Sequence, residues 1–446
     1  MEQLANQQSN GAYPEAIKYG RLPKKAVGGT SKLVRFTPSN GNTFDPVNSN
    51  IVRIPVTATG NSFLDGSHSY LQIKISADNK TTNEAQTIDG GIWACLQRCR
   101  ILCKNSGQVL EDINNYNLLH NLLFRYQTSS DKLQHHNAVS GTPPNLVNDA
   151  ASDRDDFDFT QCRKFATNTA ASDMVLCMPL ISGFLSNTKG LYVPLGASGS
   201  ALEIELTLAP ALSCMVGTTD VNYNVKSVHY YAPIVSISGD DFSSSFGQMM
   251  SVMGGLSFTG SVYENFISNM SQLGTGEKIV DIPIQCRSLR ALMTISRTTT
   301  DINSVTNHGL SVYRANATTE YNYRIGDNML PNSRIQTQIS LGDSNNIANA
   351  YNQMLLATGQ LNSIHAQTLV NNYTFNSNSF VYAVDTESFL NESGNVSHTG
   401  LDVLNGNLQC SLEVNNNISA VQRLDTYALK EVLFYIDGNG SFSVSK

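Results

Sequence analysis

Leu202-Glu203-Ile204-Glu205-Leu206-Thr207-Leu208 alternates apolar and polar residues without a break. Successive side chains of a β-strand point to opposite faces, so this pattern predicts a half-buried strand whose aliphatic residues enter a core. Glu203 and Glu205 are then expected to face solvent or a neighbouring subunit. A similar alternation recurs near the end of the chain, at Leu408, Cys410, Leu412 and Val414.

Other local patterns also occur twice. Asn115-Tyr116-Asn117-Leu118-Leu119 in the first half is echoed in the second by Ala350-Tyr351-Asn352, with Met354, Leu355 and Leu356 close behind. Each half then ends in an apolar strand and a small polar turn, at 228–240 and 429–440. Two similar β units without a catalytic motif indicate a building block rather than an enzyme.

Strand patterns dominate between these echoes. Residues 70–75 and 280–285 alternate strictly, and Pro283 places the second run at a sheet edge or a strand end, because proline cannot donate to a ladder. Two helices are predicted at matching places. Glu111 and Asp112 suit the N-terminus of the first, whose apolar face comprises Ile113, Tyr116, Leu119, Leu122 and Leu123. The second is expected to run from Ser344 as N-cap to Gly359 as C-cap, with Ile347, Ala350, Met354 and Leu355 on its apolar face.

Charged residues make up only 15% of the 446 residues, against ~25% in typical soluble domains. Such a surface suits a protein that hides much of itself against other copies. The formal net charge of −7 argues against general coating of nucleic acid, which requires Lys and Arg to displace counterions from phosphates. The charge is uneven: residues 1–35 carry six basic against two acidic residues (+4), and residues 127–160 carry two basic against six acidic ones (−4).

We divide the chain into an N-terminal arm at 1–30, a first β unit at 31–238 and a second at 239–446. Met1 is not followed by the apolar stretch of a signal peptide, and no apolar run is long enough to span a membrane, so synthesis in a cytosol is expected. Two long polar loops, 128–157 and 298–321, read as insertions on a shared scaffold.

No catalytic, cofactor-binding or metal-binding residues are predicted. Cys95, Cys99 and Cys103 read as buried thiols along one strand, spread too far for one ion. His135 and His136 are expected to be solvated in the acidic loop. Asp153, Asp155, Asp156 and Asp158 lack the order of a calcium loop, and 196–199 lacks the spacing of a nucleophile elbow. Trp93, the single tryptophan, is expected in the core.

Several stretches together resemble the double jelly-roll major capsid proteins of icosahedral DNA viruses, the lineage of adenoviruses, tectiviruses, virophages and polinton-like viruses. In the first half they are 100–113, 116–119 and 192–195. In the second half they are 321–326 with Pro331, the Tyr351 helix, 380–385 and 425–440. The resemblance covers roughly residues 31–446 and lies in the order of the pieces rather than in one motif.

The resemblance implies an all-β fold of two tandem eight-stranded jelly-roll barrels with a few short helices and long surface loops. It further implies a structural protein of the virion, made inside the host cell, that forms homotrimeric, pseudo-hexameric capsomers. Neighbouring capsomers, penton proteins and minor capsid proteins would be its partners, and no cofactor or small-molecule substrate is expected. The long loops would stand outside as towers, and the basic arm would lie inside, against neighbouring capsomers, an internal membrane or the genome.

Two other classes remain open from the residues. A two-domain β-sandwich binding module, such as a carbohydrate-binding or host-attachment protein, would show exposed aromatic residues on one face, whereas the aromatics here lie mostly in strand-like runs. A β-rich hydrolase would need a carboxylate pair, for which Glu203 and Glu205 are the nearest candidates.

Overall fold

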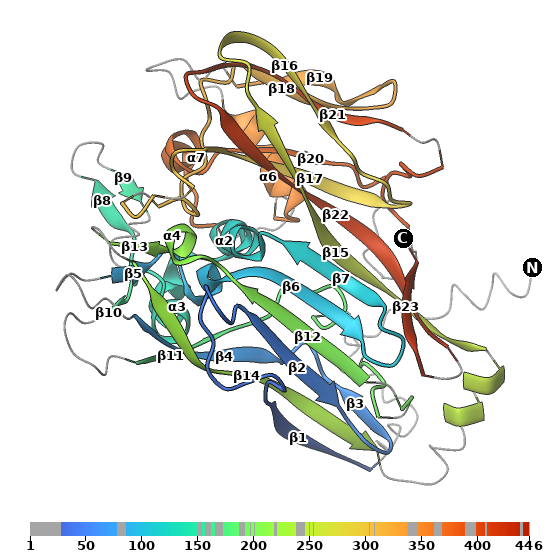
Figure 1. Cartoon of the computed structure of the whole chain (residues 1–446). Helices are drawn as coiled ribbons and strands as arrows, with labels where there is room; N and C mark the ends of the chain where they lie inside the picture. The colour runs from blue at the N-terminus through green and yellow to red at the C-terminus, as the bar shows by residue number, and fades with distance from the viewer. Residues whose placement is uncertain are drawn as a thin grey trace, which may run out of the picture.

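A computed structural model describes most of the chain. The described residues are 28–77, 86–149, 154–156, 162–165, 173–186, 192–196, 198–199, 201–217, 221–237, 246–248, 250–252, 254–302, 304–306, 308–337, 347–360, 368–388, 398–405, 408–437 and 440–445. Antiparallel strands dominate, and they form two β-sandwiches that lie side by side, one from each half of the chain (Figure 1).

The first sandwich consists of a five-stranded and a four-stranded sheet. One has the order β1-β14-β4-β11, with the short β3 (Ser62–Leu64) also paired to β14. The other has the order β2-β12-β6-β7. The strand bounds are β1 Gly29–Phe36, β2 Ile51–Thr57, β4 Tyr70–Ala77, β6 Leu96–Cys103, β7 Val109–Asn114, β11 Met174–Met178, β12 Ala201–Leu208 and β14 Tyr223–Ile237.

The second sandwich repeats this arrangement. Its sheets have the orders β15-β22-β17-β20 and β16-β21-β18-β19, and the C-terminal β23 (Phe442–Ser445) extends the first of them by pairing with β22. The strand bounds are β15 Gly255–Met270, β16 Gly274–Ile282, β17 Leu289–Thr298, β18 Glu320–Ile325, β19 Asn328–Gln336, β20 Val381–Asp385, β21 Cys410–Ile418 and β22 Gln422–Asp437.

Strand order is the same in the two halves. When the eight main strands of each half are counted along the chain, one sheet runs 1-8-3-6 and the other 2-7-4-5. The alternating stretches that echo each other in the sequence are both seventh strands, β12 and β21. The apolar closing stretches are both eighth strands, β14 and β22. The sequence echo therefore reflects a repeated topology.

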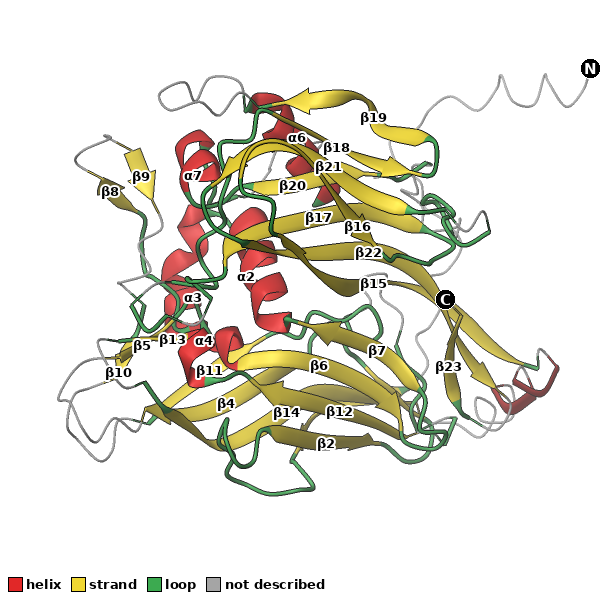
Figure 2. Ribbon diagram, turned by 45° about the horizontal axis from the view of Figure 1, so that its top comes forward, coloured by secondary structure: helices red, strands yellow, loops and turns green. Residues whose placement is uncertain are grey.

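Apart from the helical residues 246–248 and 250–252, which lie near β23, the described helices gather with most of the short extra strands toward one end of the sandwiches (Figure 2). Both halves have a helix between strands five and six: α2 (Tyr116–Gln127) in the first and α6 (Ala348–Ala357) in the second. The remaining described elements at this end are η2 Ile92–Cys95, η3 Ser130–Lys132, α3 Leu133–Ser140, α4 Ala211–Cys214, α7 Asn372–Ser377, β5 Gln86–Ile88, β8 Val147–Asp149, β9 Arg154–Asp156, β10 Lys164–Phe165 and β13 Met215–Val216.

Most element predictions are confirmed, with shifts at the ends. Residues 70–75 lie in β4, and β16 is an edge strand that ends at Ile282, just before Pro283. Glu111 and Asp112 were wrongly assigned to a helix start: they belong to β7, and α2 is capped by Asn115. Helix α6 has Ile347 rather than Ser344 as its N-cap, and Gly359 follows its C-cap Thr358 in a left-handed conformation (φ 70°).

The two equivalent eight-stranded halves differ in how their 1-8-3-6 sheets are covered. In the first half, β14 alternates between buried and half-buried residues. In the second half, β17 and β22 are buried on both faces. The first sandwich, and α2 in particular, lies against the outer face of the β15-β22-β17-β20 sheet of the second sandwich (Figure 1).

Residues 1–27 lie outside the described part of the chain, so the predicted arm stays a prediction. Gly29 and Thr30, which the prediction placed in the arm, belong to β1. The predicted boundary at 238/239 falls between the end of β14 and the start of β15 and also stays a prediction. Among the described helices, none is long and apolar enough to cross a membrane.

Candidate functional site

The N-terminus of α2 is fixed to the second sandwich by a single asparagine. Asn115 has a left-handed backbone (φ 46°), which Asn tolerates better than most residues. Its side-chain amide donates to Asn265 Oδ1 (3.0 Å) and to Asp425 Oδ1 (2.9 Å), and its carbonyl accepts from the Tyr427 hydroxyl (2.8 Å). This residue therefore joins α2 to β15 and β22 in the other half.

Asp425 is the centre of a buried ionic group at the same place. It is fully buried, and its Oδ2 accepts from Arg297 Nη2 at 2.7 Å, while the Arg297 side chain is only 4% exposed. Arg423 Nη2 donates to Oδ1 at 3.1 Å. Because a buried charge is costly unless it is paired and hydrogen-bonded, each member of this group holds the others in place.

The rest of α2 continues the junction. Asn121 donates to the Leu310 carbonyl (2.8 Å), and the Tyr126 hydroxyl donates to the Ser379 carbonyl (2.7 Å). Arg125 donates to Ser379 Oγ (2.8 Å) and lies over the Tyr313 ring, 5.0 Å from its centroid. All residues of α2 except Gln127 are buried, so this helix is an internal connector between the halves.

The loop between β17 and β18 is part of this junction. Asp89 of the first half is 2% exposed and accepts from the Leu310 amide (2.8 Å) and from Ser311 Oγ (2.6 Å). Leu310, Ser311 and Tyr313 are buried. The segment of this loop around Leu310 therefore packs onto the first half, and the place of the loop on the outer face of a shell stays a prediction.

An aromatic cluster closes the opposite end of the junction. Phe184 of the first half contacts Phe434 and Phe442 edge-on at 5.0 and 5.2 Å between ring centroids. Next to it, the chain passes so close to β15 that a Cβ on Gly183 would lie 2.2 Å from the Ser261 carbonyl oxygen. Strand β23 thereby binds to both halves through Phe442, which is fully buried.

Glu111 on β7 is a buried carboxylate beside this cluster. It accepts from Ser182 Oγ and from the Gly183 amide (2.9 Å). Burial raises the pKa of Glu111 to about 7, although these hydrogen bonds lower it. The group therefore favours its protonated form much more than an exposed glutamate does.

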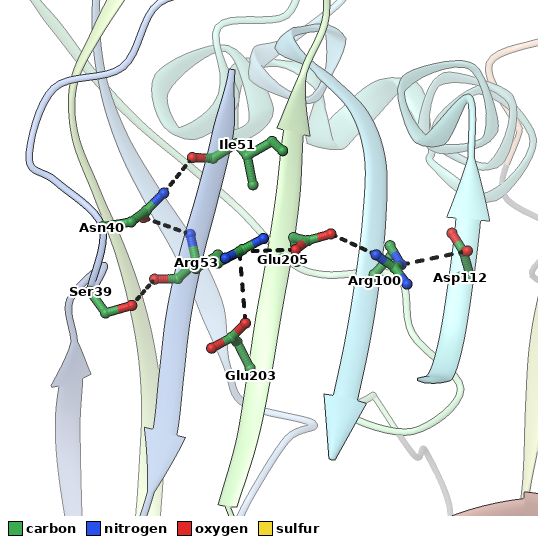
Figure 3. A network of polar contacts seen from close by, with 8 residues as sticks. All are labelled: Ser39, Asn40, Ile51, Arg53, Arg100, Asp112, Glu203 and Glu205. Carbon is green, nitrogen blue, oxygen red and sulfur yellow. Dashed lines mark hydrogen bonds and ion pairs between the residues drawn. The ribbon is translucent and has the colours of Figure 1, made fainter. Parts of the chain in front are cut away.

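The outer face of the 2-7-4-5 sheet in the first half carries a straight row of alternating charge (Figure 3). Arg53, Glu205, Arg100 and Asp112 are register partners on the four neighbouring strands β2, β12, β6 and β7. Glu205 accepts from Arg53 Nε (3.1 Å) and from Arg100 Nη1 (2.8 Å). Asp112 accepts from Arg98 Nη2 at 2.6 Å. Opposite charges directly across strands stabilise a sheet.

The equivalent sheet of the second half has a comparable network. Glu413 on β21 accepts from Arg324 Nε (2.6 Å) and from Asn322 Nδ2 (3.1 Å). Burial alone would raise the pKa of Glu413, but these two donors lower it overall. Arg334 on β19 binds Glu320 (2.8 Å) and Glu277. Both sandwiches therefore present one sheet face with largely self-compensated charge.

Sequence reasoning placed some of these residues correctly. Trp93 is 1% exposed, as predicted, and Cys95, Cys99 and Cys103 are buried thiols. Cys95 ends η2, however, and only Cys99 and Cys103 lie on β6. Glu205 was expected to face solvent or a neighbour but is 9% exposed between two arginines. Its burial was not predictable from alternation, because both partners lie far away in the sequence.

The acidic loop is more structured than predicted. His135 and His136 lie on α3, and His136 is half-buried with its ring edge-on to Phe124 at 5.0 Å. Burial lowers the pKa of His136. Asp155 and Asp156 lie on β9, which pairs with β8, and Asp153 and Asp158 fall outside the described residues. Within the described part, no group of three or more potential ligands could hold a metal ion.

Comparison with known structures identifies the architecture. The chain is similar to the Faustovirus major capsid protein (TM-score 0.59, 9% identity, covering 97% of this chain and 96% of that one). It is similar to a chain of the PBCV-1 virus capsid (TM-score 0.57, 9% identity, covering 96% of this chain and 99% of that one). It is also similar to the mavirus major capsid protein (TM-score 0.50, 10% identity, covering 97% of this chain and 94% of that one). No protein-family model matches the sequence, and no curated protein sequence is significantly similar to it.

At such low identity the likeness shows the fold. It extends over both halves in one alignment, so the two sandwiches and their arrangement are shared, not only a single barrel. The predicted class, two tandem eight-stranded jelly rolls with a few short helices, is confirmed.

Proposed function

We propose that this chain is a major capsid protein, a structural subunit that self-associates into homotrimers and tiles the icosahedral shell of a virion. One observation carries the proposal: the same eight-stranded topology occurs twice in one chain, in an arrangement shared along 97% of the chain with the Faustovirus major capsid protein. Three copies of two similar barrels approximate sixfold symmetry and can fill a hexagonal position.

The junction supports this role mechanically. Two barrels can act as neighbouring positions of a six-part ring only if their relative orientation is fixed. The hydrogen bonds of Asn115 with Asp425 and Tyr427, the other α2 contacts and the Phe184 cluster fix it here. Such a junction resembles the interior of one domain more than a flexible contact between two domains.

The further partners follow from the same proposal. Neighbouring capsomers, penton proteins and minor capsid proteins would contact the outer faces of the trimer. The basic arm would contact neighbouring capsomers, an internal membrane or the genome from the inside. The chain would act without a cofactor, a small-molecule substrate or enzymatic turnover, in the capsid of particles assembled inside the host cell.

Purified full-length protein tests the proposal. Size-exclusion chromatography with light scattering is expected to give three times the chain mass, and negative-stain electron microscopy is expected to show six-lobed particles. A protein that stays monomeric at high concentration and yields no assembly products would overturn the proposal.

A further inference from the structure

One lysine and one asparagine interrupt the apolar core of the second sandwich. In the first half, the second and seventh strands turn aliphatic residues toward the core, namely Val52, Ile54 and Val56 on β2 and Leu202, Ile204, Leu206 and Leu208 on β12. The equivalent strands of the second half, β16 and β21, place Lys278 and Asn416 on their buried faces. Lys278 is 4% exposed and Asn416 is 1% exposed. Because burying polar groups is costly, this pair departs from the shared core pattern.

The two side chains are in direct contact. Lys278 Nζ donates to Asn416 Oδ1 at 2.8 Å. It also donates to three backbone carbonyls, those of Gly274 (2.9 Å), Asn416 (3.1 Å) and Gly276 (3.4 Å). Among the described residues, no carboxylate pairs with this amine, so its acceptors there are neutral oxygens. Burial lowers the pKa of Lys278, which favours the uncharged amine, the nucleophilic form of lysine.

The side-chain amide of Asn416 is placed for attack by this amine. Its Cγ is bonded to the oxygen that Lys278 contacts, so it lies at most about 4 Å from Nζ, given a C=O bond of about 1.23 Å. Its Nδ2 has only a weak acceptor in Met270 Sδ, at 3.6 Å. Burial raises the pKa of the Tyr382 hydroxyl, and hydrogen bonds with Thr318 and Asn416 partly offset the rise. This hydroxyl therefore lies beside the amide and can carry a proton to Nδ2.

We propose that Lys278 and Asn416 form an isopeptide bond inside the second sandwich of each chain. Lys278 Nζ bonds to Asn416 Cγ, the Cγ–Nδ2 bond breaks, and the proton lost by Nζ leaves with Nδ2 as ammonia. No oxidant, reductant or cofactor is needed, because the exchange of one amine for another at an amide is not a redox step. Well-positioned groups in one molecule reach effective concentrations of about 10⁵–10⁸ M, which offsets the low reactivity of an amide. The product is a neutral amide, so the reaction removes a buried amine that water would otherwise charge.

The bond fastens an edge strand to its sheet. Among the described strands, β16 pairs with β21 alone, in a ladder from Gly274 to Ile282 (Figure 1). An edge strand is held on one side only and opens more easily than a central strand. A covalent link between β16 and β21 keeps them together even when the ladder opens. The bond forms within one chain and does not depend on association between copies, so its test is independent of the capsid proposal.

Mass spectrometry of the full-length protein, denatured after it has folded, tests the bond. The intact mass is expected to lie one ammonia below the sequence mass, and digestion is expected to give one branched peptide that joins Lys278 to Asn416. Because the uncharged amine reacts, any unlinked fraction should decrease faster at about pH 9 than at about pH 7. Separate, unmodified peptides for both residues after incubation of the folded protein at the higher pH would overturn the proposal.

Substitutions assign the loss of ammonia to these two side chains. Lys278→Arg and Asn416→Ser should each keep the full sequence mass. The matched control is Lys430→Arg, because Lys430 is similarly buried (6% exposed) but paired with Glu264 at 2.5 Å, and this variant should still lose one ammonia. Asparagine can also lose ammonia by closing a ring onto its own backbone, so a loss that persists in Lys278→Arg would contradict the proposal. The branched peptide of the wild type decides the question even if a variant folds poorly.

Discussion

Buried carboxylates help to fix the relative orientation of the two jelly rolls. Among them, Asp425 pairs with the buried Arg297 and accepts a hydrogen bond from Asn115 of the other half. Replacing it by Ala would leave Arg297 buried without its partner, which costs about 3–5 kcal/mol in comparable sites. Chemical denaturation of Asp425→Ala should show that loss. The control is Glu203→Ala, which removes a half-exposed carboxylate 4.0 Å from Arg53 and should cost at most about 1 kcal/mol. Equal losses in the two variants would contradict the assigned role.

Glu111 gives the junction a dependence on pH. Its pKa is raised by burial to about 7 from an ordinary 4.5, so the folded protein retains a proton that the unfolded chain releases. This stabilisation is complete below pH 4.5 and is lost as the pH rises through about 7. At ~1.4 kcal/mol per pH unit, it amounts to at most about 3 kcal/mol.

Glu111→Gln should therefore gain stability relative to the wild type as the pH rises from 4.5 to 8, because glutamine imitates the protonated acid. Denaturation curves of both proteins at four or five pH values measure the difference. His120, whose pKa burial lowers to about 4, has the opposite pH dependence but is present in both proteins and cancels. A difference that stays constant across this range would disprove the raised pKa.

These residues mark the limit of what sequence can predict. The alternation around Glu205 correctly indicates a strand, but its burial depends on Arg53 and Arg100, which reach it only through sheet pairing. Asp425 has the same difficulty, because Asn115 lies 310 positions away. Partners at such separations are set by topology, and local periodicity carries no information about them.

At the scale of elements, β23 connects the two halves, because it pairs with β22 and its Phe442 packs against Phe184 of the first half. Phe442 is fully buried against Phe184, so Phe442→Ala should cost about 3–5 kcal/mol. Tyr435 on the neighbouring β22 is 37% exposed, and Tyr435→Ala should cost about 1 kcal/mol as the matched control. Thermal and chemical denaturation can rank the two variants. A larger loss for Tyr435→Ala would show that β23 contributes little to the junction.

The close approach at Gly183 provides a second test at this scale. A Cβ there would meet the Ser261 carbonyl at 2.2 Å, and backbone cannot move aside as a flexible side chain can. Gly183→Ala should therefore cost about 1–3 kcal/mol, as overpacked sites do, and should loosen the contact between the halves. Gly247→Ala, where no atom lies within 4 Å of the added Cβ, is the control and should fold normally. Hydrogen exchange of β15 amides measures the loosening.

Element predictions succeeded where the pattern was long and failed at junctions. The seventh strands and the two helices were visible in the sequence because their periodicity persists over about eight residues or more. Glu111 and Asp112 were mistaken for a helix start, because acidic residues before an apolar helix also suit an N-terminus. The loop around Leu310 was predicted as an insertion from its polar composition, which did not reveal that the Leu310 amide and the Ser311 hydroxyl bind Asp89 of the other half.

At the scale of the whole molecule, the repeat is the property that sequence reveals best. Its two copies have the same strand order, yet they differ in coverage, because one sheet of the second half lies under the first half and its counterpart is open. The repeated topology therefore does not give equal burial, since Tyr427 on the covered sheet is fully buried whereas Val175 on its counterpart is 51% exposed.

The arm is expected to act in shell assembly and not in folding. Strand β1 pairs with β14 from Gly29 onward, so deletion of residues 1–27 spares every described strand. The deleted protein should keep the wild-type denaturation midpoint and form trimers, but its yield of larger shells should fall. Changing Lys18, Arg21, Lys24 and Lys25 to Gln separates charge from length: if the arm contacts acidic partners, this full-length variant should show the same defect. Sedimentation and electron microscopy of assembly reactions measure the yield, and normal shells from the deleted protein would remove the arm from the assembly mechanism.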